Sequence, residues 1–376
     1  MKQLPYIFLI SLLLLLSSCI TQFIPQVSED KEILVVEGLV TDQPEAYVIN
    51  LSMSLPLGSK STARPLKGCA VSISDNMGKS YSLKETSLGT YKTDPTIFQG
   101  IIGRFYTLHI KTSAAAGNLN YVSSALEMKP VPPIDSVYYE KKTIREKDMF
   151  NPTTEGCQIY LNTHDATNNC KFYRWEFSET WEFHLPYTVP NPICWISANS
   201  DMINIKNTTV LNEDRILRFP VSFISNETDR LRERYSMLVN QYSLNEEEYL
   251  YWEKLQTMSE QVGGLYDIIP SAIQSNVRCA DNPGEKVLGF FSVSATTSKR
   301  IFINDNFMGL VNLYTNCIAD TVFNGKPVPS LNISAWVIID HPIPPPQYQV
   351  YTYSKGCYDC TVRGTNIEPL FWKSGK

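Results

Sequence analysis

The most regular stretch of the chain is FYRWEFSETWEF, at residues 172–183. Aromatic residues occupy every second position, at Tyr173, Trp175 and Phe177, while the positions between them, from Arg174 onward, are polar. Side chains of a β-strand point alternately to its two faces, so the alternation predicts a long strand with one buried face and one face in water. We therefore expect a β-sheet that covers a hydrophobic core.

The composition extends this expectation to the whole chain. Its 376 residues are too many for one typical core and predict two domains. Hydrophobic residues make up 43% and charged residues 19%, which indicates a folded chain. The 21 Tyr and 23 Pro favour strands and turns, so we expect a mainly β protein. A net charge of −5 without a basic block argues against nucleic acid binding.

The first eighteen residues have the order of a bacterial lipoprotein signal peptide. Lys2 is followed by the apolar run Ile7–Leu16 and then by the small residues Ser17 and Ser18. Cys19 comes next, where such a signal needs its lipidated cysteine. The alternatives are a transmembrane helix, for which the run falls well short of the roughly 20 residues required, and an ordinary cleaved signal with a chance cysteine. We expect a lipid anchor at Cys19.

Residues 19–31 have no sustained hydrophobic period and are expected to form a lipidated tether. Ile20 follows Cys19, so the aspartate that commonly retains lipoproteins in the inner membrane is absent. The expected location is therefore the outer membrane. Surface exposure is our expectation there, and the periplasmic face is the alternative.

Residues 32–129 predict a small β-sandwich, because short alternating strands follow one another about every ten residues with turn residues between them. The order of strands and glycine turns resembles the immunoglobulin-like modules of the transthyretin or carboxypeptidase-regulatory type. Residues 130–134 contain three prolines and predict a semi-rigid joint. Residues 135–376 are expected to form a larger β-rich domain.

One helix, at about residues 243–262, is expected in this larger domain. Ser243 and Glu246 have the spacing of a capping box, and apolar residues recur after them at helical spacing. The glutamates that follow, up to Glu248, lie in the first turn, where the helix dipole favours them. Further along, residues 287–294 and 300–303 predict a β-hairpin.

The cysteines other than Cys19 are even in number, which allows disulfides in an exported protein. Cys157 and Cys170 flank a predicted hairpin and could bridge it. Cys357 and Cys360 form a Cys-x-x-Cys pair with three open readings: a local or long-range disulfide, two buried thiols, or part of a metal or redox site.

Motifs of catalysis are not recognisable in the chain. None of the four histidines stands in a His-Glu-x-x-His frame, and phosphate loops, nucleophile elbows and dinucleotide fingerprints are missing. We therefore expect no catalytic residues, no metal and no cofactor. A binding surface could use four aromatic residues, although core packing is the commoner use of such side chains. They are Tyr173, Trp175, Trp181 and Trp195.

Several phrases, taken in order, resemble the domain-of-unknown-function 4249 family of Bacteroidota lipoproteins. These phrases are Asp135–Tyr139, Tyr173–Phe177, Arg234–Ser236, Gln241–Leu244, Tyr249–Trp252, Gly263–Asp267, Leu288–Phe291 and Cys357–Trp372. The resemblance implies an outer-membrane lipoprotein, often encoded beside a TonB-dependent barrel transporter, and no established activity.

Three functions follow as hypotheses. The first is a lipid-anchored outer-membrane accessory or binding protein that partners a TonB-dependent barrel transporter, with the sandwich as spacer and the larger domain in contact with ligand or barrel. The second is a structural or assembly subunit of an outer-membrane complex without a small ligand. The third is a glycan or peptide hydrolase, which paired carboxylates in a cleft would favour.

Overall fold

The computed structural model describes residues 32–54, 63–145, 153–185, 189, 191–260, 273–304, 320–323, 337–340, 348–352 and 355–375. The signal peptide, Cys19 and the tether lie outside these residues. The described chain is mainly β and has one α-helix. Within it, no helix is long and apolar enough to span a membrane.

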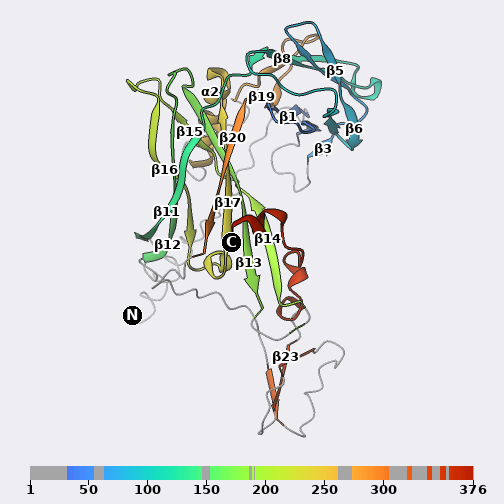
Figure 1. Cartoon of the computed structure of the whole chain (residues 1–376). Helices are drawn as coiled ribbons and strands as arrows, with labels where there is room; N and C mark the ends of the chain where they lie inside the picture. Colours follow the sequence, from blue (N-terminus) through green and yellow to red (C-terminus); the bar gives the residue numbers. More distant parts are fainter. Residues whose placement is uncertain are drawn as a thin grey trace, which may run out of the picture.

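Two sheets pack face to face and form a first sandwich (Figure 1). The first sheet has the order β19 (Val287–Val293), β1 (Leu34–Val40), β2 (Val48–Met53), β7 (Thr90–Lys92) and β6 (Lys84–Ser87), with β3 (Arg64–Pro65) beside β2. The second has the order β18 (Val277–Cys279), β9 (Asn120–Ser123), β8 (Phe105–Lys111), β4 (Ala70–Asp75) and β5 (Ser80–Ser82), with β10 (Leu126–Glu127) beside β8. The buried core includes Val36, Ile49 and Leu108 from both sheets.

The sequence predicted a sandwich built from residues 32–129 alone, and this prediction is wrong. Strand β19 pairs in parallel with β1, and β18 pairs with β9, so each sheet takes an edge strand from the second half of the chain. Gly289 has a φ of +81°, and a Cβ there would lie 2.0 Å from the Val36 carbonyl oxygen. Only glycine therefore permits this close parallel approach.

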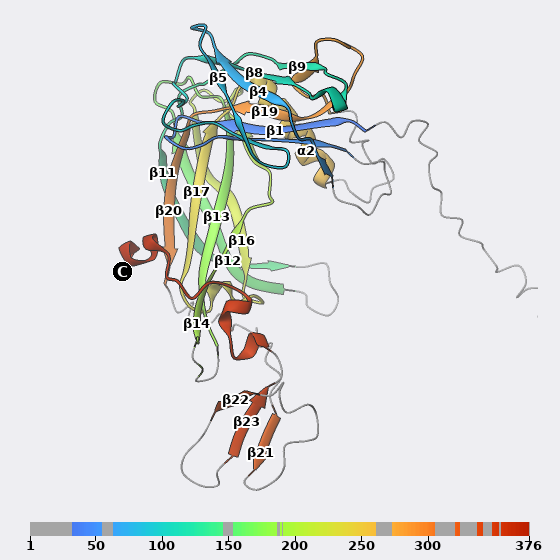
Figure 2. The same cartoon turned by 90° about the vertical axis from the view of Figure 1, so that its right-hand side faces the viewer.

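A second sandwich of longer strands carries the stretch at residues 172–183. One sheet has the order β11 (Ile134–Arg145), β12 (Thr153–His164) and β16 (Arg215–Ser225). The facing sheet has the order β14 (Ile193–Asn199), β13 (Phe172–His184), β17 (Tyr235–Ser243) and β20 (Thr296–Ile303), with β15 (Asn204–Asn207) beside β13. Trp175, Ile159 and Met237 are among the residues that fill the core between them. A small sheet has the order β21 (Asp320–Phe323), β23 (Tyr348–Thr352) and β22 (Val337–Asp340). It lies beyond the end of the second sandwich that is farthest from the first sandwich (Figure 2).

The predicted hairpin at residues 287–294 and 300–303 is wrong. Strand β19 belongs to the first sandwich, whereas β20 pairs with β17 in the second. The two strands are separate because the chain crosses from one sandwich to the other between them, where the Thr296 amide donates to Asp42 Oδ1 at 2.9 Å. The alternation of both strands was correct, but local pattern does not choose a strand's partner.

The helix α2 (Glu246–Glu260) begins three residues later than predicted, and the capping box is wrong. Ser243 ends β17, and its hydroxyl donates to the Lys129 carbonyl at 3.2 Å. Asn245 precedes the helix, where its carbonyl accepts from the Tyr249 amide at 2.9 Å. The helix packs between the sandwiches: Tyr251 contacts Phe290 of β19 with ring centroids 4.8 Å apart.

The polar face of β13 was expected to lie in water, but α2 covers one end of it. Arg174 is only 7% exposed, and its guanidinium lies 3.9 Å from the ring centroid of Trp252 on α2. It also forms an ion pair with Glu176. Opposite, Glu248 is completely buried, and Trp252 Nε1 donates to its Oε1 at 3.4 Å. The helix dipole alone, which sufficed in the sequence interpretation, does not account for a glutamate in this position.

The buried carboxyl of Glu248 has an unusual proton affinity. Burial raises its pKa to about 7, against the smaller opposing attraction of the Arg174 guanidinium. Within the described part of the chain, its Oε2 has no hydrogen-bond partner. The joint between the sandwiches therefore contains a carboxyl group that gains a proton more readily than an ordinary glutamate.

Candidate functional site

A C-terminal tail, residues 355–375, wraps around the edge strand β14 at the end of the second sandwich farthest from α2 (Figures 1 and 2). It contains the short 3₁₀ helices η5 (Lys355–Cys357), η6 (Cys360–Val362) and η7 (Leu370–Gly375). Trp195 and Thr365 exchange backbone hydrogen bonds of 2.8 and 3.0 Å, so the tail pairs with β14. The tail thereby covers backbone groups that an edge strand would leave open.

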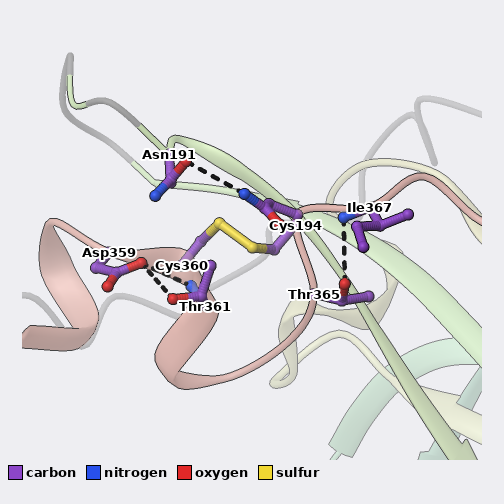
Figure 3. Close-up of a disulfide and its surroundings, with 8 residues drawn as sticks. Asn191, Cys194, Asp359, Cys360, Thr361, Thr365 and Ile367 are labelled. Carbon is purple, nitrogen blue, oxygen red and sulfur yellow. Dashed lines mark hydrogen bonds between the residues drawn. A yellow bond between two sulfur atoms is a disulfide. The ribbon is translucent and has the colours of Figure 1, made fainter.

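A disulfide fastens the tail to this strand. Cys194 of β14 and Cys360 of η6 are bonded across a separation of 166 residues, with Cα atoms 5.7 Å apart (Figure 3). Cys357 is disulfide-bonded as well. Of the predicted possibilities for the Cys-x-x-Cys pair, the long-range disulfide is therefore correct for Cys360. The predicted bridge between Cys157 and Cys170 is wrong, because both are buried thiols.

Cations stacked on aromatic rings hold the rest of the tail. The guanidinium of Arg234, which precedes β17, lies 4.4 Å from the ring centroid of Phe302 and 5.0 Å from that of Trp372. Its Nη1 donates to the Trp372 carbonyl oxygen at 2.8 Å. Arg300 stacks in the same way on Phe371, at 3.7 Å. Such contacts bury cations against rings in place of water.

The tail and the outer face of the sheet together line an open cleft of about 520 Å³, a size typical of small-molecule sites. Strand register places Glu182 of β13 beside Trp195 of β14, and the Glu182 amide donates to the Arg234 carbonyl at 2.9 Å. These residues line the cleft together with Asn191, Pro192, Ile193, Asn304, Asn366, Glu368 and Trp372. The walls combine indole rings with amide, carboxylate and guanidinium groups.

Some polar groups of the residues that line the cleft have hydrogen-bond partners and others have none. Glu182 Oε2 accepts from Trp372 Nε1 at 2.9 Å, and its Oε1 lies 2.7 Å from His184 Nε2. By contrast, Nε and Nη2 of Arg234 and Nε1 of Trp195 are buried and have no hydrogen-bond partner among the residues that the structure describes. A buried donor without an acceptor costs free energy. Two residues that line the cleft therefore carry unused donors.

The four aromatic residues predicted as a binding surface do not lie together. Tyr173 and Trp175 are fully buried and stack on each other in the second core, and Trp181 is only 7% exposed. Core packing is thus the role of these three. Trp195 alone of the four lines the cleft.

The cleft has the composition of a binding site. Two of its lining residues, Arg234 and Trp195, carry buried donors without a partner among the described residues, beside apolar surface. This combination suits an acceptor-rich ligand with an apolar part. Among the described residues, no group of three or more His, Cys, Asp or Glu side chains could hold a metal ion.

Sequence reasoning missed Arg234, Glu182 and Trp372 as parts of a site. Arg234 and Trp372 stand 138 positions apart and meet only through the fold. The available signal was the aromatic pair Phe371-Trp372 in a polar closing segment, with cysteine nearby. That signal indicates a docked tail but does not say where it docks.

A model of the family described as Domain of unknown function (DUF4249) matches residues 20–300. The chain belongs to this family. The match covers the first sandwich, α2 and the second sandwich as far as the middle of β20, and it ends before the tail, which supplies Trp372 and Asn366 to the cleft. Membership in DUF4249 confirms the domain family that the sequence resembled, and it carries no activity with it.

Curated proteins gave no match to this DUF4249 chain. Among solved structures, a "Biofilm associated protein - BSP domain" aligns with 7% identity over 73% of this chain and 62% of the other, with a TM-score of 0.11. The chain thus spans less than two thirds of that structure. A likeness this low carries no argument about fold or function.

Proposed function

We propose that this DUF4249 protein is a lipid-anchored accessory or binding protein of the outer membrane that works beside a TonB-dependent barrel transporter. The observation that carries the proposal is the segment Leu16-Ser17-Ser18-Cys19 after a short apolar run. The disulfide between Cys194 and Cys360 supports it, because structural disulfides persist mainly in exported proteins.

The architecture supports a division of labour in this role. The first sandwich follows the tether directly, since β1 starts at Leu34, and it would act as the spacer from the membrane. The second sandwich and the tail, which carry the cleft, would meet ligand or barrel. Binding is proposed ahead of catalysis, because both oxygens of Glu182 in the cleft already contact Trp372 and His184.

Lipid attachment is testable with a Cys19→Ser variant. Cells fed an alkyne-tagged fatty acid should label the wild-type protein, which should fractionate with the outer membrane, because several acyl chains together hold a protein on a bilayer. The variant should lose the label and the outer-membrane location. Cys69→Ser, at a half-buried thiol of the first sandwich, is the matched control and should keep both. An equally labelled Cys19→Ser protein would refute the anchor.

A further inference from the structure

We propose that the cleft beneath the C-terminal tail binds a small ligand through a carboxylate, which the Nε–Nη2 edge of Arg234 receives. This inference deepens the proposed function and rests on its binding role, but it needs neither the lipid nor the barrel. It names the chemical class that the cleft recognises.

The guanidinium of Arg234 leaves one edge for a ligand. Trp372 and Phe302 lie over its faces, and Nη1 donates to the Trp372 carbonyl. Nε and Nη2 remain buried and unpartnered. These two N–H groups point side by side from one edge of the planar group, so they match the two oxygens of a carboxylate in a bidentate pair.

The surroundings favour an anion that also carries apolar surface. Trp195 Nε1 is a third unpartnered donor among the lining residues, while the oxygens of Glu182 are engaged by Trp372 and His184. Asn191 and Asn366 add amide groups that can donate and accept. Glu368 is the remaining carboxylate of the lining and would repel an anion, so the bidentate pair must outweigh it.

Binding requires a modest rearrangement of the entrance. The unpartnered atoms of Arg234 are buried, so the ligand must displace the groups that cover them. Rotamer changes of this kind are common when interfaces form.

The test titrates the full-length lipidated protein in mild detergent with two acids and their neutral counterparts, by calorimetry. D-glucuronate against D-glucose probes a sugar acid, and glycyl-phenylalanine against its amide probes a peptide carboxylate. We expect one acid to bind and its neutral counterpart to bind about 10- to 100-fold more weakly, as the loss of charge-assisted hydrogen bonds predicts. The acid that binds identifies the source of the carboxylate.

Variants separate the recognition of the ligand from the docking of the tail. Arg234→Lys keeps the charge but loses the fork, and should weaken acid binding about 10- to 100-fold. Trp195→Phe removes one donor without touching the tail's cation stacks and should also weaken binding. Arg300→Lys is the matched control, since Arg300 stacks on Phe371 but does not line the cleft, and it should bind like the wild type.

Three results would overturn the proposal: neither acid binds, a neutral counterpart binds as tightly as its acid, or Arg300→Lys weakens binding as much as Arg234→Lys. A protein that co-purifies with a barrel but binds neither acid would contradict this inference alone. The proposed function would then stand without it.

Discussion

Replacing Arg174 with methionine should lower the free energy of unfolding by about 3–5 kcal/mol, the usual cost of removing one partner from a buried charged cluster. The guanidinium is 7% exposed, stacks on Trp252 and pairs with Glu176. Its charge also favours the ionised form of Glu248, which is completely buried. Methionine keeps much of the volume, so the loss reports the charge rather than a cavity.

Urea denaturation at pH 8 measures this loss, and a second substitution tests its cause. In Arg174→Met/Glu248→Leu the unpaired carboxylate is gone as well, and most of the lost stability should return. Arg218→Met, which breaks an exposed ion pair with Glu140, serves as control and should leave stability nearly unchanged. If the double variant is as unstable as the single one, the electrostatic account of the joint is wrong.

Glu248 should make the protein less stable as the pH rises from about 4.5 to about 7. Burial raises the pKa of Glu248 from 4.5 in a free side chain to about 7 in the fold. The folded state therefore holds this proton more tightly than the unfolded state does. The resulting stabilisation is complete below the unfolded pKa and is lost as the pH passes through the folded one, and it amounts to about 3 kcal/mol.

Glu248→Gln should remove that slope. The difference in unfolding free energy between pH 5 and pH 8 should shift by about 2.5 kcal/mol relative to the wild type, while other titrating groups contribute equally to both proteins. Glu247→Gln, one residue earlier and exposed, is the matched control and should retain the wild-type slope. Identical pH profiles for Glu248→Gln and the wild type would show that Glu248 is charged throughout this range.

The sequence was informative where local periodicity determines structure. Alternation predicted β13 and its buried aromatic face, and helical spacing predicted α2 to within three residues at its start. The sequence was not informative where a contact between distant parts of the chain determines the environment of a residue. Arg174 looked exposed because nothing in its own strand shows that α2 covers that face.

Partner choice was the other limit of the sequence. The parallel pairing of β19 with β1 follows from the close approach at Gly289, which a strand pattern does not reveal. In the same way, eight cysteines allow many pairings, and the bond from Cys360 to Cys194 depends on the tail wrapping around β14. The cleft was unpredictable for this reason: its walls come from the ends of four strands, β13, β14, β17 and β20, and from the tail.

The most direct test of the central claim is affinity purification of the tagged, lipidated protein from its own outer membrane in mild detergent, followed by mass spectrometry. The account predicts a TonB-dependent barrel in stoichiometric amount, which Cys19→Ser should fail to recover because it is not held at the same membrane. Recovery of the lipoprotein alone, under conditions that preserve known barrel–lipoprotein pairs, would contradict a stable partnership with a transporter.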